Sequence, residues 1–204
     1  MAITYVSESN SGNTDLPTVN VPAGIADDDD VIVCLHKDGN DNTTSLTDFT
    51  YQSALSGSEG SMEHRIFTKT AASESGSYDF ADIGGAEQWV CGCIAVRDST
   101  GFDVGDYTSE AGSSNPDIVI PSVNVAEDDS LAIVFITTED ADTVSAPDGT
   151  WTEVYNISQG TSTTGAGGSC WTKIVPSGAT GTLTFTYYTL ADEIAGCIII
   201  YSPS

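Results

Sequence analysis

Apolar residues along this chain recur with a period of two, in short runs rich in β-branched and aromatic side chains. Successive side chains of a β-strand point to opposite faces, so this pattern indicates strands. Clusters of Gly, Ser, Asn and Asp separate the runs, and no long window shows the helical period of about 3.6 residues. The chain is therefore predicted to be all-β. The expected strands are 3–7, 17–21, 30–36, 47–51, 63–69, 76–80, 89–96, 116–120, 130–136, 150–155, 169–175, 182–188 and 195–201.

Two halves of the sequence match each other. "PTVNV" at 17–21 matches "PSVNV" 104 residues further on, and the acidic turn and strand at 26–35 match 126–135. The segments 67–69 and 92–94 match 171–173 and 196–198. Each copy has the size of a minimal β-sandwich. These matches predict a tandem duplicated antiparallel β-sandwich, jelly-roll-like or immunoglobulin-like.

The boundary between the two copies is expected after residue 98. Repeat 1 then covers 1–98 and repeat 2 covers 99–204, either as separate domains or packed as one unit. The segment 98–115 between them is a linker or, at "FDVGDY", the first strand of the second copy.

The net charge limits the classes of partner. The chain has 30 acidic residues against 5 Lys and Arg, for a formal charge of −25. Binding to nucleic acid or to an anionic membrane surface requires clustered cations, so neither is expected. Like charges repel at low ionic strength, and molar salt screens them. We therefore predict adaptation to saline conditions, with ordinary acidic extracellular or viral β proteins as the alternative.

The N-terminal segment "MAITYVSESNSG" has neither the basic region nor the continuous apolar region of a secretory signal. No apolar run approaches the roughly 20 residues that span a membrane. The chain is expected to be made and folded in a cytoplasm.

The five cysteines, Cys34, Cys91, Cys93, Cys170 and Cys197, lie inside apolar runs. We interpret them as small core side chains rather than disulfide partners. A zinc site is the alternative, although the chain has only two histidines and no paired Cys-x-x-Cys motifs.

The run Asp27, Asp28, Asp29 and Asp30 invites a calcium interpretation because hard cations bind clustered carboxylates. The matching "AEDD" turn in the second half favours turn chemistry instead, in which Asp side chains accept backbone N–H hydrogen bonds. No metal and no cofactor are expected, with these four residues as the weak cation candidates. A second weak group is Glu139, Asp140 and Asp142, whereas "DGNDNTTSLTDF" lacks the Gly and Glu of an EF-hand loop.

No catalytic residue is predicted. Only His36 and His64 are available for a Ser–His–acid triad, and no nucleophile motif is present. Both histidines are interpreted as hydrogen-bonded or exposed, with His64 on the strand face opposite Arg65. Paired acids that cleave glycosides remain an alternative that the sequence does not locate. "GTSTTGAGGS" at 160–169 lacks the Lys of a phosphate-binding loop and is interpreted as a flexible loop tip.

Glycan binding is the principal alternative to a structural role, because β-sandwiches often present exposed aromatic side chains to sugars. Here Trp89, Trp151 and Trp171 lie at or within expected strands, and Leu183, Phe185 and Tyr187 share one strand face. Such aromatic residues are more often core residues than binding platforms.

Several segments together resemble a broad group of uncharacterised phage and prophage structural proteins. They are "MAITYVSES", "VNVPAGIADDDDVIVCL", the "W/F-T-K" strand and "GCIAVRDSTG". The chain departs from the family pattern at the usual "GD" turn, here "DD", and at Pro-Gly-Trp, which is found only loosely at 147–151.

The resemblance implies jelly-roll-like or immunoglobulin-like modules of heads, tails or fibres. We therefore expect a virion structural protein, decorating the capsid or forming a head-fibre or tail accessory. It would form a homo-oligomer and contact other virion proteins such as the major capsid protein. The alternative is a host-receptor or glycan-binding module. Lys37 and Arg97 are the candidate assembly contacts, because the few cations would pair with the many acids.

Overall fold

The computed structural model describes residues 2–12, 18–39, 45–81, 88–111, 117–139, 143–161, 164–187 and 193–204. These residues form an all-β structure with several antiparallel sheets and a single short 3₁₀ turn, η1 (Ser53–Leu55). The predicted fold class, all-β, is confirmed.

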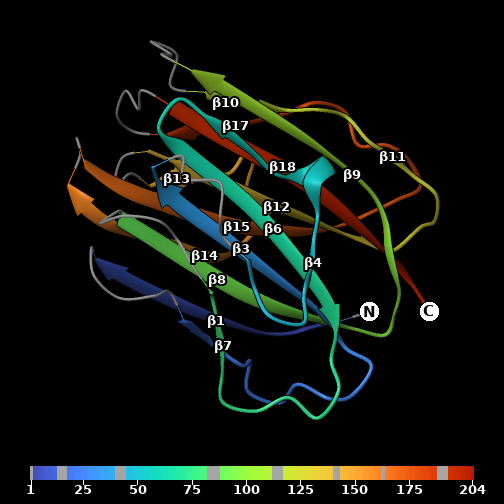
Figure 1. Cartoon of the computed structure of the whole chain (residues 1–204). Coiled ribbons are helices and arrows are strands. Elements are labelled where there is room, and N and C mark those ends of the chain that lie inside the picture. The colour runs from blue at the N-terminus through green and yellow to red at the C-terminus, as the bar shows by residue number, and fades with distance from the viewer. Residues whose placement is uncertain are drawn as a thin grey trace.

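Two large sheets lie at the centre of the molecule (Figure 1). The first sheet has the strand order β1 (Ala2–Gly12), β8 (Gln88–Arg97), β3 (Asp30–Asp38), β6 (Met62–Thr70) and β4 (Thr50–Tyr51), and β5 (Gly57–Glu59) also pairs with β6. The second sheet has the order β14 (Thr152–Thr161), β15 (Thr164–Val175), β12 (Ser130–Thr138), β18 (Glu193–Pro203) and β9 (Ser99–Ala111).

Smaller sheets cover the outer faces of the large ones. β2 (Thr18–Asn20) pairs with β7 (Ser77–Asp79) beside the first sheet. The second sheet is covered by β10 (Asp117–Ile120), β17 (Leu183–Tyr187) and β13 (Val144–Ser145), and by β11 (Asn124–Val125) paired with β16 (Gly178–Ala179).

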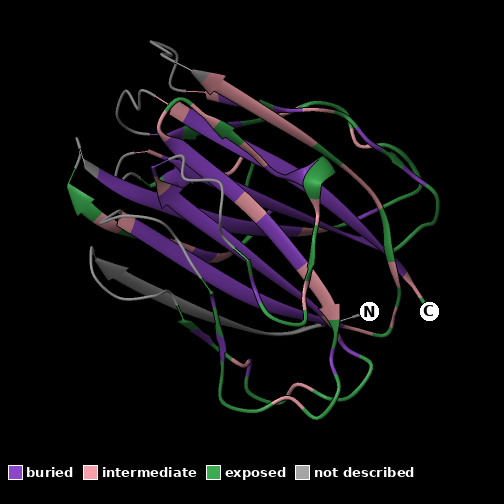
Figure 2. Ribbon diagram, viewed as in Figure 1, coloured by how far each residue is buried: buried purple, intermediate pink, exposed green. Residues whose placement is uncertain are grey.

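The central strands of each large sheet are therefore buried on both faces. A core between the two sheets, which we call the inner core, combines side chains from both halves of the sequence, such as Ile32, Ile66, Phe135 and Ile199. Two outer cores lie on the opposite faces, one under β2 and β7 and one under β10 and β17. Strands buried on both faces read as continuous apolar runs, as in "VIVCL" and "LAIVFI". Figure 2 shows this burial along the central strands, with exposed residues mainly in loops and short strands.

The cores in which the strand residues pack correct one detail of the match between the two halves of the sequence. Val31, Val33 and Leu35 pack in an outer core, whereas their sequence matches Leu131, Ile133 and Phe135 pack in the inner core. A shift of one residue moves every side chain of a strand to the other face. The segments at 26–35 and 126–135 are therefore aligned in sequence but not in strand face.

Two other segments differ from, or refine, the sequence interpretation. "FDVGDY" belongs to a long strand, β9, which pairs with β18, so the linker alternative is wrong. The glycine-rich stretch at 160–169 is not a flexible loop tip. Most of it forms the paired ends of β14 and β15, and Gly165, Gly167 and Gly168 are buried.

Candidate functional site

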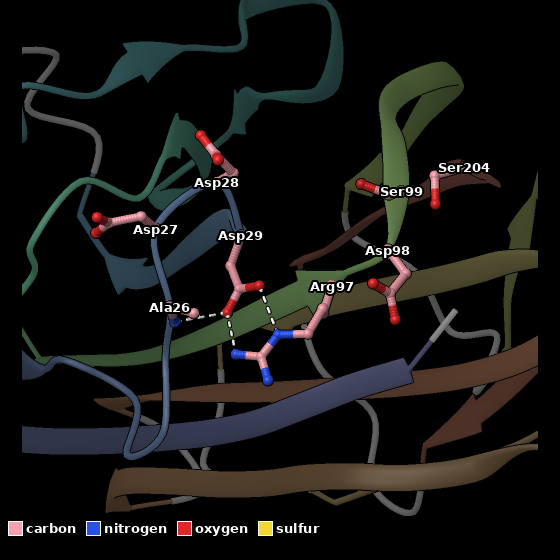
Figure 3. A pocket seen from close by; sticks show the side chains of 8 residues that line it. All are labelled: Ala26, Asp27, Asp28, Asp29, Arg97, Asp98, Ser99 and Ser204. Atoms are coloured by element: carbon pink, nitrogen blue, oxygen red, sulfur yellow. Dashed lines mark hydrogen bonds and ion pairs between the residues drawn. The ribbon is translucent and has the colours of Figure 1, made fainter.

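The acidic turn before β3 lines a surface pocket of about 460 Å³ (Figure 3). The turn joins the loop after β2 to the first residue of β3, and the opposite wall comes from the end of β8 and the start of β9. The pocket is lined by Ala26, Asp27, Asp28, Asp29, Arg97, Asp98, Ser99 and Ser204.

Asp29 and Arg97 form the central interaction of this pocket. Arg97 Nε donates to Asp29 Oδ1 at 2.8 Å and its NH2 group donates to Asp29 Oδ2 at 2.7 Å. The backbone N–H of Ala26 also donates to Asp29 Oδ2, at 2.8 Å. The hydrogen bonds from Arg97 lower the pKa of Asp29, against the opposing effect of burial. The pair is a bidentate ion pair made within the chain.

The neighbouring carboxylates serve the turn rather than a common centre. Asp27 Oδ1 accepts the backbone N–H of Ser73 at 2.6 Å, and Asp30 accepts the hydroxyl of Ser99. Asp28 has a positive φ of 71°, which Asp tolerates better than most residues. In Figure 3 the side chains of Asp27 and Asp28 point away from Asp29. The predicted turn chemistry is confirmed for Asp27 and Asp29.

The second acidic turn works in the same way. Asp128 Oδ1 accepts the backbone N–H of Ser177 at 2.7 Å and its hydroxyl at 2.8 Å, and these bonds lower the pKa of Asp128. Glu139 Oε1 accepts the hydroxyl of Ser61 at 2.6 Å. Asp140 and Asp142, the other members of the second weak cation group, lie outside the described residues.

The two assembly candidates lie in different environments. The Arg97 side chain is 35% exposed at the rim of the pocket. Lys37 lies on β3, on the outer face of the first sheet, and has no exposed surface. Its ammonium nitrogen is 4.0 Å from Oε2 of the equally buried Glu63, whose Oε1 accepts a hydrogen bond from Arg65 at 2.9 Å. Burial thus removes Lys37 from the surface on which an assembly contact would form.

Sequence reasoning missed a polar cluster inside the inner core. Cys34, His36 and His64 are fully buried, and their metal-ligand atoms all lie within 4.8 Å of one another. The sequence signal is Cys-x-His on one strand with a second histidine on its neighbour. That signal becomes a cluster only through the β3–β6 register, which places His36 directly opposite His64. Among the described residues, this cluster is the one group with metal-ligand spacing, and the aspartates of the acidic turn are not part of it.

The interpretation of the remaining core residues is confirmed. All five cysteines are free and buried, and Trp89, Trp151 and Trp171 are at most 7% exposed. His64 lies with Met62 and Ile66 among the buried residues, while Arg65 is partly exposed.

Comparison with protein-family models, with curated proteins and with solved structures finds no significant match to this chain. In the part of the chain that the structure describes, no helix has the length and hydropathy of a membrane span.

The Asp29–Arg97 pair leads to a pH-dependent prediction. We expect Arg97→Met to destabilise the protein at pH 7, because the Asp29 carboxylate loses its main donors. Asp29 has a lowered pKa in the folded state, so its stabilisation is complete above its ordinary pKa of about 4 and is lost as the pH falls below that value. Urea unfolding of both proteins between pH 7 and pH 2 should therefore show converging stabilities at the acid end.

Lys173→Met is the matched control for this prediction. Lys173 lies 3.9 Å from Asp148, whose side chain is half exposed, so the loss of this ion pair should change stability less than Arg97→Met does and without the same dependence on pH. An Arg97→Met deficit that persisted unchanged at acid pH would contradict the assignment to the Asp29 carboxylate.

Proposed function

We propose that this chain is a virion structural protein, carried on the particle surface as a capsid decoration or as a head-fibre or tail accessory. The proposal includes assembly as an oligomer and contact with other virion proteins such as the major capsid protein. It extends to production in the host cytoplasm and adaptation to saline conditions. The resemblance to phage and prophage structural proteins supports it, together with the surface properties described below.

We further propose that the fold is a duplicated, jelly-roll-like or immunoglobulin-like sandwich. The strand orders β1-β8-β3-β6-β4 and β9-β18-β12-β15-β14 correspond position by position. In the first sheet, β1 pairs with β8 at one side, and the central strand β3 comes next. In the second sheet, β9 pairs with β18 at one side, and the central strand β12 comes next. Repeat 1 at 1–98 and repeat 2 at 99–204 then pack as one unit through the inner core.

The observation that carries the proposed function is that the central strands of both large sheets are buried on both faces within the chain itself. The surface open to partners includes the loops, the outward side of the small sheets and the edge strands β1, β4, β9 and β14. Edge strand β9 exposes Asp103 and Asp106, and charged edges oppose uncontrolled strand pairing. Such a surface suits controlled contacts in a repeated assembly. The burial of all three tryptophans favours this role over a glycan platform.

Arg97 remains the proposed assembly contact, but reversing its charge is not a suitable test of assembly. Reversing its charge would place two carboxyl groups together at Asp29, and the fold itself would be disturbed. A test of assembly should therefore leave Arg97 unchanged and measure directly how much of the protein the particle contains.

The deciding experiment is a count of copies per particle by quantitative mass spectrometry of purified virions, relative to the major shell protein. Hundreds of copies would support a capsid decoration, and tens or fewer would support a vertex fibre or a tail accessory. Absence from purified particles would overturn the virion proposal.

The saline adaptation leads to its own prediction. We expect the thermal midpoint to rise by several degrees between dilute buffer and 1 M NaCl, because the Debye length falls from tens of ångströms to about 3 Å and screens a charge of −25. Most of the rise should occur below about 0.3 M, where screening rather than salt-specific hydration dominates. A flat or falling midpoint across that range would contradict the prediction.

A further inference from the structure

The buried cluster of Cys34, His36 and His64 is assembled by the pairing of two strands. Cys34 and His36 are two residues apart on β3, so both point to the inner face. His64 is the residue on β6 that lies directly opposite His36. Side chains of directly opposed residues start about 5 Å apart, which brings both imidazoles beside the thiol. The arrangement is therefore a property of the sheet register and not of a loop.

The distances within the cluster are close to those of a tetrahedral metal centre. Cys34 Sγ lies 3.7 Å from Nδ1 of His36 and 4.0 Å from Nδ1 of His64. Zinc bonds of about 2.3 Å to sulfur and 2.0 Å to nitrogen place these ligand atoms about 3.6 Å apart. A shift of a few tenths of an ångström would bring the sulfur to that distance from both nitrogens, and all three ligand atoms already lie within 4.8 Å of one another.

The orientation of both imidazoles also suits the binding of a metal ion. The two Nδ1 atoms converge on one point, since Thr137 Oγ1 lies 2.6 Å from Nδ1 of His36 and 2.7 Å from Nδ1 of His64. On the far side of each ring, Nε2 of His36 is 3.1 Å from the hydroxyl of Tyr155, and Nε2 of His64 is 3.4 Å from Cys197 Sγ. Ligating histidines characteristically hold their second nitrogen in this way.

Without a metal, these groups close into a hydrogen-bonded chain from Tyr155 through His36, Thr137 and His64 to Cys197. The Thr137 hydroxyl can donate to one Nδ1 and accept from the other, and the chain can run in either direction. Cys34 is the one residue of the cluster that is not required for this series of hydrogen bonds. Its thiol faces two nitrogens that Thr137 already serves.

We propose that Cys34, His36 and His64 bind one divalent transition-metal ion of the zinc class, with the Thr137 hydroxyl or a water molecule in the fourth position. Thiolate and imidazole together suit Zn(II) and Co(II). On binding, the Cys34 thiol releases its proton and both imidazoles bind as neutral ligands.

All three proposed ligands belong to the first sheet, and the second sheet covers them with Thr137, Tyr155 and Cys197. The rings are closely packed: a Cβ on Gly168 would lie 2.3 Å from an atom of His36. The metal would therefore enter during folding, before the sheets pack. Exchange from the folded protein should be slow.

The test is to unfold the whole chain in denaturant and chelator and to refold it with and without Co(II), followed by desalting. We expect close to one cobalt per chain, a thiolate-to-cobalt charge-transfer band and the intense visible bands of a four-coordinate ion. Wild-type protein that retains no stoichiometric metal after refolding would overturn the proposal, whatever the variants do.

Three variants make the assignment specific. Cys34→Ser should lose the charge-transfer band, whereas Cys170→Ser, which changes another buried cysteine of the inner core, should keep it. Thr137→Val leaves all three protein ligands in place, and water can fill the fourth position, so this variant should keep the band. Loss of the band in Cys170→Ser, or its persistence in folded Cys34→Ser, would overturn the assignment.

Discussion

Gly92→Ala is expected to lower the free energy of unfolding by about 3 kcal/mol, because overpacking of a tight core displaces side chains that have no free space. Gly92 lies on β8 and faces the inner core. A Cβ added there would lie 2.2 Å from ring atoms of Tyr155. That ring is itself fixed, since it is buried and its hydroxyl is 3.1 Å from Nε2 of His36. Urea unfolding at neutral pH, followed by tryptophan fluorescence, measures the loss.

The matched control for Gly92→Ala is Gly149→Ala. Gly149 is exposed, and an added Cβ there meets no atom within 4 Å, so stability should change by less than about 0.5 kcal/mol. In a Tyr155→Leu background the clashing ring atoms are absent, and the cost of Gly92→Ala should shrink. An equal cost in both backgrounds would show that Tyr155 is not the cause.

Glu63→Gln is expected to destabilise the protein by about 3–5 kcal/mol, since it removes the counter-charge of a buried cation. Lys37 and Glu63 have no exposed surface, and Arg65 also donates to Glu63. Among the described residues, Lys37 Nζ has no hydrogen-bond partner, so the carboxylate of Glu63 is its main stabilising neighbour. Chemical denaturation of wild type and variant measures the difference.

Asp148→Asn is the control for that prediction, because the Asp148–Lys173 pair carries the same charges at an exposed position. Its effect should be much smaller than that of Glu63→Gln, because solvent screens an exposed pair. Lys37→Met combined with Glu63→Gln should recover much of the stability, since the buried ammonium is then gone. A double variant as unstable as Glu63→Gln alone would contradict this account.

Local patterns in the sequence were enough to predict most of the long strands and much of the core. The short apolar runs in "DVIVCLH" and "AGCIIIY" predict buried strands, and β3 and β18 follow those segments closely. Cysteines and tryptophans inside such runs were correctly interpreted as core residues. The same logic predicts the acidic turns, because an Asp just before a buried strand can accept the N–H groups that the turn leaves free.

The register of the strands and the way the two large sheets stack could not be predicted from local sequence patterns. The sequence match of 26–35 with 126–135 says nothing of which face meets the other sheet, and the structure puts the matched residues on opposite faces. His36 and His64 were considered one at a time because 28 residues separate them and only strand pairing makes them neighbours. Lys37 resembled a surface cation because nothing in sequence shows that Glu63 is buried beside it.

The same limit applies to the glycine-rich stretch. Its composition indicates a loop, yet its glycines are required by packing: Gly168 leaves the space that the His36 ring fills. Glycine within a strand often marks such a close approach.

The pairing of β18 has a consequence for folding. It pairs with both β12 and β9 in the second sheet, and each of these strands lies more than 50 residues before it in the chain. Pairing between strands that are distant in sequence is slow, because loop closure must come first. The apolar inner face of the first sheet must therefore be shielded, by the chain itself or by a chaperone, until the second sheet covers it. Deleting Glu193–Pro203 should yield aggregated protein rather than a shorter soluble one.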